Sequence, residues 1–251
     1  MTLTLVIPVY KEHLRFESSL RQIVAFMAEE KAQGVEIDVV FVDDGSPEAS
    51  AAVINDLISD RNDPRMRLLR YAVNQGKGYA VRTGILAAGG ELILMSDADL
   101  STPLQDWRKL KDALDAGADI ACGSRAVRGA HIGKPPPFHR RVLSRIFNLL
   151  VRLAGVHNFK DTQCGFKLFR AEPAKIIFER MRTRRFAFDV EMIAMARDLG
   201  YNVAEVPVRW DYSGHSTVKV FSSGSRMLID LLRLAVRRWI FGRTKARRAE
   251  R

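Results

Sequence analysis

Long apolar runs and cysteines are both scarce in this sequence of 251 residues. No stretch reaches the roughly 18 uncharged apolar residues that a membrane-spanning helix needs, and no basic leader precedes the first apolar segment. We therefore expect neither a transmembrane helix nor a signal peptide. The two cysteines, Cys122 and Cys164, are too few for a disulfide scaffold and lack the neighbours of a zinc site. We expect two buried thiols in a reducing compartment.

Acidic residues are fewer than basic residues, and the basic excess is concentrated at one end. The chain has 40 Lys and Arg against 29 Asp and Glu, which gives a net charge of +11. Residues 226–251 contain nine Lys or Arg and two acids, together with several leucines and a tryptophan. Basic proteins often bind nucleic acid, but no recognised binding motif or interleaved aromatic platform is present. We expect no nucleic acid partner.

Short apolar runs alternate with helical patterns from the N-terminus to Cys122. Buried strands are predicted at Leu3–Val9, Ile37–Val42, Arg67–Arg70, Leu92–Ser96 and Asp119–Cys122. Helices are predicted at 16–32, 47–60, 77–88 and 104–116. This alternation predicts an α/β fold in which helices cover both faces of a parallel sheet.

The pattern changes after Cys122. Residues 128–137 include three consecutive prolines, which predicts a loop. The remaining predicted elements are an amphipathic segment at 140–153, a strand at Gly165–Phe169, helices near 171–180 and 188–199, a strand at Val203–Val208 and a basic helix near 225–240. We expect one α/β domain with a C-terminal extension.

Two pairs of aspartates follow predicted strands. Asp43 and Asp44 end the second strand, and Asp97 and Asp99 follow the fourth. Each pair alone also suits an ordinary turn or helix cap. Together they lie at the carboxyl ends of strands, where open parallel sheets bind ligands. Close carboxylates repel one another unless a cation is present, and Mg²⁺ or Mn²⁺ prefers such ligands together with substrate phosphates.

A glycine-containing segment, Asn74–Gly78, leads into the predicted helix at 77–88. Glycine allows close backbone approach, a helix N-terminus favours phosphate, and Lys77 adds a positive charge there. The segment lacks the spacing and the Lys-Ser/Thr ending of a P-loop, which argues against an ATPase. Taken alone, the segment does not identify a ligand.

Four motifs occur in the same order as in a known family. They are Val6–Glu12 (VIPVYKE), Val42–Ser46 (VDDGS), Asn74–Gly78 (NQGKG) and Asp97–Asp99 (DAD). This order resembles family 2 glycosyltransferases with the GT-A fold. Three later motifs, Gly123–Arg125, Asp161–Lys167 and Phe188–Glu191, resemble the polyprenyl-phosphate branch of that family, and Asp99–Pro103 (DLSTP) resembles its dolichyl-phosphate glucosyltransferases. The resemblance covers about residues 2–235. It implies a GT-A (Rossmann-like), mostly parallel sheet flanked by helices, with a C-terminal amphipathic helical extension.

The resemblance also implies an activity and a set of site residues. The activity is inverting transfer of glucose from UDP-glucose to a polyprenyl (dolichyl-type) phosphate, with Mg²⁺ or Mn²⁺. The implied nucleotide-binding residues are Pro8, Tyr10, Glu12, Asp43 or Asp44, Lys77 and Asp97. The implied catalytic residues are Asp97, Asp99, Gln163, Asp189 and Glu191, of which Asp97 and Asp99 would also hold the metal. The implied phosphate and acceptor residues are Arg125, Arg209, Ser216 and Lys219. Thr217 stands where the branch usually has a lysine, and Lys219 or Arg209 would take the place of that lysine.

The acceptor determines whether a general base is needed. The second pKa of a phosphate monoester is near 6, so a polyprenyl phosphate is already largely ionised at neutral pH. We therefore expect direct displacement with inversion and no obligatory base. Asp189 and Glu191 equally fit a solvated acidic pair on one helix face. A saccharide hydroxyl acceptor would need such a base and predicts a bell-shaped pH profile, and GDP-mannose is an alternative donor.

The resemblance divides the chain into an expected GT-A domain, 1–222, and a basic amphipathic tail, 223–251. Within the domain, about 1–125 would bind the nucleotide sugar and about 126–222 the acceptor. Arg140–Leu153 and Met227–Phe241 combine apolar residues with arginines, a composition typical of helices at a membrane surface. We expect a peripheral enzyme on the cytoplasmic side of a membrane. Packing on the core or an oligomer interface is the alternative, and the oligomeric state stays open.

Overall fold

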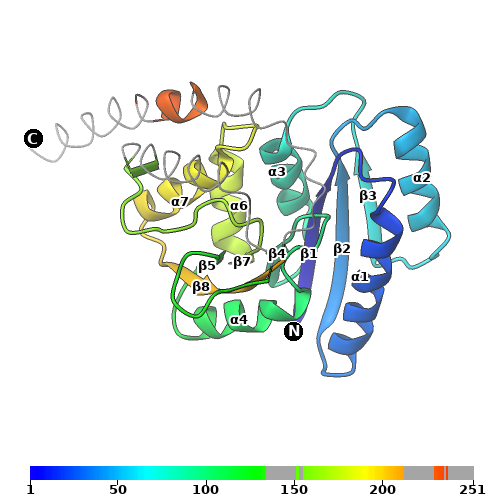
Figure 1. Cartoon of the computed structure of the whole chain (residues 1–251), viewed down its shortest axis with the longest axis horizontal. Coiled ribbons are helices and arrows are strands. Elements are labelled where there is room, and N and C mark those ends of the chain that lie inside the picture. The colour runs from blue at the N-terminus through cyan, green and yellow to red at the C-terminus, as the bar shows by residue number, and fades with distance from the viewer. Residues whose placement is uncertain (134–150, 153–154, 212–228, 235, 237–251) are drawn as a thin grey trace, which may run out of the picture.

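The computed structural model of the chain describes residues 1–133, 151–152, 155–211, 229–234 and 236. Within them, seven strands form one sheet in the order β3-β2-β1-β4-β7-β5-β8 (Figure 1). The strands are β1 (Thr2–Val9), β2 (Glu36–Asp43), β3 (Met66–Arg70), β4 (Leu92–Met95), β5 (Ile120–Ser124), β7 (Lys167–Arg170) and β8 (Val203–Pro207). The helices are α1 (Phe16–Lys31), α2 (Glu48–Ser59), α3 (Lys77–Ala87), η1 (Leu104–Asp106), α4 (Trp107–Asp115), α6 (Ala171–Arg180) and α7 (Phe188–Asp198).

Helices cover both faces of this sheet, as the sequence predicts. Buried residues of α1, α2 and α4 pack on one face, and those of α3, α6 and α7 pack on the other. Strand side chains alternate between the two cores: Leu5 and Ile7 of β1 join the first, and Val6 between them joins the second. The central strands are therefore apolar on both sides, which is why they appear in the sequence as continuous hydrophobic runs.

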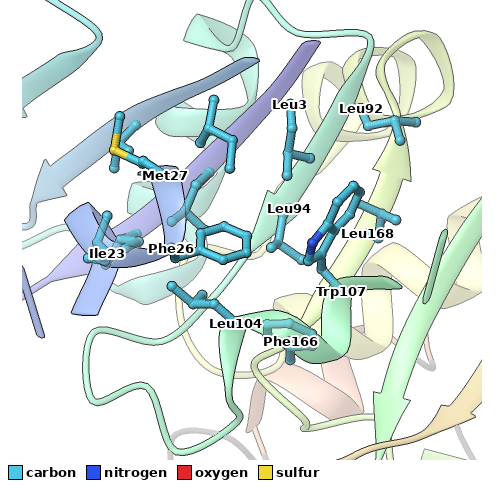
Figure 2. Close-up of a cluster of buried hydrophobic side chains, with 14 of the residues drawn as sticks. Leu3, Ile23, Phe26, Met27, Leu92, Leu94, Leu104, Trp107, Phe166 and Leu168 are labelled. Carbon is cyan, nitrogen blue, oxygen red and sulfur yellow. The ribbon is translucent and has the colours of Figure 1, made fainter. Parts of the chain in front are cut away.

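Trp107 anchors the first core beneath the middle of the sheet. Its indole is fully buried and lies beside Leu94 of β4 and Leu168 of β7 (Figure 2). The indole N–H donates a hydrogen bond to Glu30 Oε1 at 3.0 Å, so the polar atom of this large side chain is satisfied. Trp107 therefore packs against both β4 and β7 from the side of the first core.

Strand β7 is the one member of this described sheet that runs against its neighbours. It lies between β4 and β5 and pairs antiparallel with both, whereas the other pairs are parallel. Its first residue, Lys167, lies opposite Met95, the last residue of β4. The turn that enters β7 is therefore placed beside the carboxyl end of β4, where Asp97 and Asp99 follow.

The predicted elements agree with the structure to within about two residues at most ends. Two predictions need correction. The helix predicted at 104–116 is divided into η1 and α4, and the predicted loop at 128–137 contains a short strand, β6 (His131–Ile132). Strand β6 pairs with β9 (Arg209–Trp210) in a second sheet, and a partner so distant in sequence leaves no local pattern to detect. The amphipathic segment 140–153 lies mostly outside the described residues, as does the helix near 225–240.

Both cysteines are buried and free, as predicted. Burial raises the pKa of Cys122 to about 12 and that of Cys164 to about 11, so neither is a reactive thiolate at neutral pH. Among the described residues, no helix has the length and apolarity to cross a bilayer.

Candidate active site

The segment after β4 carries the first pair of predicted catalytic residues. Ser96 N–H donates to Val6 O at 3.1 Å and continues the sheet pairing, and the chain then turns at Asp97–Leu100. Leu100 has a φ of 48°, an uncommon left-handed conformation, and its N–H donates to Asp97 O. Asp99 Oδ1 accepts the N–H of Ser101 at 3.0 Å. This turn presents both carboxylates at the carboxyl edge of the sheet.

Lys77, at the start of α3, lies against Asp97. Its Nζ is 2.5 Å from Asp97 Oδ1, and both side chains are partly exposed. Burial lowers the pKa of Lys77, but Asp97 and Asp189 together raise it above its ordinary value. The ammonium is therefore charged at neutral pH, where it can contact a carboxylate or a phosphate.

Asp189 approaches the same place from the first turn of α7. It is 3% exposed, and its Oδ1 accepts a hydrogen bond from the buried Lys167 at 2.6 Å. Gln163 Nε2 lies 3.5 Å from Asp189 Oδ2. Burial raises the pKa of Asp189 above its ordinary value, against the opposing attraction of Lys167 and Lys77. Four predicted residues, Lys77, Asp97, Gln163 and Asp189, are thus brought together.

Glu191 has a different environment from Asp189. It is also 3% exposed, and its Oε2 accepts the backbone N–H groups of Thr183 at 2.6 Å and Arg182 at 3.2 Å. The interpretation of Asp189 and Glu191 as a solvated pair on a helix face is therefore wrong, because both are buried. Glu191 fixes the loop between α6 and α7, and Arg184 O in that loop accepts the N–H of Tyr79 in α3.

The aspartates after β2 organise the Asn74–Gly78 loop. Asp44 accepts hydrogen bonds from Asn74 Nδ2 and from the N–H groups of Gln75 and Gly76, at 2.8–3.1 Å. Burial raises the pKa of Asp44, and the two N–H groups oppose this. Asp43 accepts the N–H of Ser46, while its Oδ2 is buried without a hydrogen bond among the described residues.

Gly45 connects these aspartates to the loop. Its φ is +68°, and a Cβ built on it would lie 2.4 Å from Asn74 N. Only glycine allows the two loops to approach so closely.

The residues after β1 complete the same edge. Pro8 and Tyr10 are partly exposed, and Glu12 is 9% exposed and paired with Arg15. The hydrogen bonds from Arg15 to Glu12 raise the pKa of Arg15, and Asp99 and Asp97 contribute further attraction. Lys11 N–H donates to Ser46 Oγ at 2.9 Å, which ties the loop after β1 to the loop after β2.

The predicted acceptor residues fall into three groups. Arg125 forms a bidentate ion pair with Asp161, with Nε and Nη2 at 2.7 and 2.8 Å from the two carboxylate oxygens. Arg209 instead pairs with Asp106, at the end of η1. Ser216 and Lys219 lie outside the described residues.

Four residues that received no role of their own from the sequence support the site: Arg15, and Asp161, Gly165 and Lys167 of the Asp161–Lys167 motif. Lys167 had a usable signal, since a lysine within the apolar run Phe166–Phe169 predicts a buried charge with a partner. Gly165 had none. A Cβ built on it would lie 2.1 Å from Asp97 Oδ2, and this contact exists only in the folded chain.

An open α/β sheet with carboxylates, a lysine and a helix N-terminus at its carboxyl edge fits the class of α/β enzymes that bind phosphorylated ligands at this edge. The model of "Glycosyl transferase family 2" matches residues 4–178. The chain belongs to this family and is a glycosyltransferase.

Two curated relatives match over nearly the whole chain. A dolichyl-phosphate beta-glucosyltransferase of Trichomonas vaginalis is 36% identical over 93% of this chain and 70% of its own length. The dolichyl-phosphate beta-glucosyltransferase of Dictyostelium discoideum is 34% identical over 94% of this chain and 74% of its own. The subtype suggested by Asp99–Pro103 agrees with both names.

Solved structures confirm the fold. A mannosyltransferase from Pyrobaculum calidifontis, in complex with GDP-Man and Mn²⁺, has a TM-score of 0.64 and 19% identity, covering 94% of this chain and 64% of that chain. Glucosyl-3-phosphoglycerate synthase from Mycobacterium tuberculosis, with Mn²⁺, UDP and phosphoglyceric acid, has a TM-score of 0.66 and 16% identity, covering 94% of this chain and 78% of that chain. The two carry different nucleotides, so the shared fold does not select the donor.

Proposed function

We propose that this enzyme transfers glucose from UDP-glucose to a polyprenyl phosphate of the dolichyl type. The observation that carries the proposal is the match to dolichyl-phosphate beta-glucosyltransferases over more than nine-tenths of the chain. The glucose of UDP-glucose is α-linked, so a β-linked product requires net inversion at the anomeric carbon. A single in-line displacement by the acceptor phosphate accounts for that outcome.

The nucleotide would bind across the loops that follow β1, β2 and β3. Pro8, Tyr10, Glu12 and either Asp43 or Asp44 would contact the nucleoside, and Lys77 would face the diphosphate. The N-terminus of α3 adds a favourable field for phosphate. Lys77 Nζ lies 2.5 Å from Asp97 Oδ1, so the ammonium would contact a diphosphate that binds beside Asp97.

Asp97 and Asp99 fit a divalent cation by their chemistry. Both are oxygen ligands on one tight turn, and Asp97 is partly exposed. No group of three or more His, Cys, Asp or Glu among the described residues is arranged to hold a metal, so the substrate diphosphate would supply further ligands. Bound Mg²⁺ or Mn²⁺ would stabilise the departing nucleoside diphosphate.

The acceptor phosphate would approach from the side of Arg125, Gln163 and Asp189. Arg125 brings a guanidinium fixed by Asp161, and it also lies near enough to Asp97 to be attracted by it. Because the acceptor is already ionised, Asp189 would orient groups rather than remove a proton. Arg209, Ser216 and Lys219 remain proposed phosphate-binding residues. Glu191 remains a proposed catalytic residue, and in the structure it accepts the N–H groups of Arg182 and Thr183.

The division into donor half (about 1–125), acceptor half (about 126–222) and tail (223–251) is part of the proposal. In the described part of the tail, Leu231 and Leu234 are buried against the second core. Ile229, Leu232 and Val236 are about half exposed and recur at helical spacing. This second apolar face supports peripheral binding to a membrane surface.

A donor screen tests the proposed reaction. Purified enzyme, vesicles containing polyprenyl phosphate and Mg²⁺ or Mn²⁺ are incubated with labelled UDP-glucose, UDP-galactose, UDP-N-acetylglucosamine or GDP-mannose. We expect label in the lipid fraction with UDP-glucose and its loss with Asp99→Asn. Preferred transfer from GDP-mannose would overturn the donor assignment. Transfer only to a soluble hydroxyl, with a bell-shaped pH profile, would overturn the acceptor assignment.

Flotation with anionic liposomes tests the membrane face. Replacing Ile229, Leu232 and Val236 with serine leaves the buried Leu231 and Leu234 in place, so the fold is retained while the exposed apolar face is removed. We expect reduced flotation for this variant and for a chain truncated after Gly224. Unchanged binding of both would remove the tail from the proposal.

A further inference from the structure

One buried cation, Lys167, lies next to the acidic centre formed by Asp97, Asp99 and Asp189, and none of the roles proposed above belongs to it. It is the first residue of β7, and its side chain is 0% exposed. Its Nζ donates hydrogen bonds to Asp189 Oδ1 at 2.6 Å and to the carbonyl oxygen of Cys164. A buried ammonium persists only with partners of this kind, because taking it out of water is otherwise strongly unfavourable.

The partners of Lys167 are the groups that shape the site. Asp189 is the residue to which Gln163 Nε2 points, at 3.5 Å. The Cys164 carbonyl belongs to the turn that contains Gly165, and Gly165 lies directly against the carboxylate of Asp97. One ammonium therefore fixes the helix that carries Asp189 and the turn that limits where Asp97 can lie.

We propose that Lys167 is a positioning residue for the transfer reaction. Through its ion pair with Asp189 and its bond to the turn at 163–165, it sets the relative positions of Gln163, Asp189 and Asp97. The proposal rests on the proposed function, in which these three groups border the reacting atoms. The hydrogen bonds that fix Asp44 to Asn74–Gly76 are formed without Lys167, so its loss should affect kcat far more than the KM for the donor.

Arg108→Met is a control in which a buried acid away from the site loses one of its two partners and keeps the other, Trp107. The Arg108 guanidinium lies 2.5 Å from Glu30, which is 2% exposed. Glu30 is at the end of α1 that leads into β2, and the acidic centre lies at the opposite, carboxyl ends of the strands. Arg108→Met and Lys167→Met should therefore both lower the Tm, and only Lys167→Met should lower kcat.

The experiment compares Tm, kcat and donor KM for these variants with the wild-type enzyme. For Lys167→Met we expect kcat to fall by about 10- to 100-fold, with donor KM changed by less than about threefold. For Arg108→Met we expect a lower Tm and an unchanged kcat. If Lys167→Met resembles Arg108→Met, with a lower Tm and a wild-type kcat, Lys167 is only structural and the proposal is overturned.

A double variant covers the case in which Lys167→Met does not fold. Lys167→Met with Asp189→Asn contains no unpaired buried charge, so we expect its Tm to recover. Its kcat should be about that of Asp189→Asn alone, because both changes break one ion pair. A wild-type kcat in the double variant, or a kcat more than about tenfold below that of Asp189→Asn alone, would overturn the proposal.

The proposed function is tested separately in the same assay. Wild-type transfer to polyprenyl phosphate tests the reaction itself. The ratio of variant to wild-type kcat tests Lys167 and can be measured with whichever acceptor the wild-type enzyme uses.

Discussion

Gly165→Ala tests how closely the position of Asp97 must be maintained. The backbone of Gly165 is not in the left-handed region, so alanine is acceptable there on conformational grounds. The added Cβ, however, would lie 2.1 Å from Asp97 Oδ2, where contacts below 3.0 Å do not persist. The carboxylate or the turn must therefore move by about 1 Å, and a displacement of this size at a reacting centre lowers rates by about 100-fold.

This rate loss corresponds to about 2.7 kcal/mol of transition-state stabilisation. Overpacking of this kind also destabilises proteins by about 1–3 kcal/mol, so Tm is measured beside kcat. Gly89→Ala is the control, because its Cβ would meet nothing within 4 Å and its φ is not positive. A folded Gly165→Ala enzyme with the kcat of Gly89→Ala would refute the reasoning, since the position of Asp97 would then be unimportant.

Three further predictions concern the donor loop, pH and metal. Asp44→Asn replaces the carboxylate that accepts N–H groups of Asn74, Gln75 and Gly76, which destabilises the loop at Asn74–Gly76 by about 1–3 kcal/mol. We expect a higher donor KM in steady-state kinetics. An unchanged KM would refute a role of Asp44 in donor binding. Burial raises the pKa of Asp161, but its hydrogen bonds and ion pair with Arg125 together have the larger effect and hold the pKa below the ordinary value of 3.8. The pair therefore stabilises the fold fully above pH 3.8, and this stabilisation is lost as the pH falls through the lower pKa of the folded state. Asp161→Asn should accordingly flatten the acid side of a plot of Tm against pH. Chelation of divalent cations should abolish transfer and Mn²⁺ or Mg²⁺ should restore it; full activity in chelator would remove the metal from the proposal.

The sequence predicted the architecture well because its signals are local. Strands apolar on both faces alternate with amphipathic helices, and this pattern alone indicates a sheet covered on both sides. The resemblance of the DAD and DDGS motifs then identified the family. The direction of β7 was not predictable, because an apolar run of four residues has the same pattern in either orientation.

Contacts between distant segments were equally hidden in the sequence. Asp189 and Glu191 could be expected in solvent as charged residues of one helix, but they are two residues apart, lie on different sides of α7 and are each buried against a different partner. Arg125 and Arg209 both suit a phosphate by residue type, and their partners, Asp161 and Asp106, came only from the structure.

The sequence by itself determined the layered α/β fold, the family and the carboxylates at the edge of the sheet, because residue type and periodicity encode these features locally. The tertiary structure decided how that edge is assembled. Antiparallel insertion of β7 brings Lys167 opposite Met95 and places Gly165 against Asp97. Packing of α7 then brings Asp189 to within 2.6 Å of Lys167. These contacts depend on strand order and orientation, which long-range packing selects and local pattern does not record.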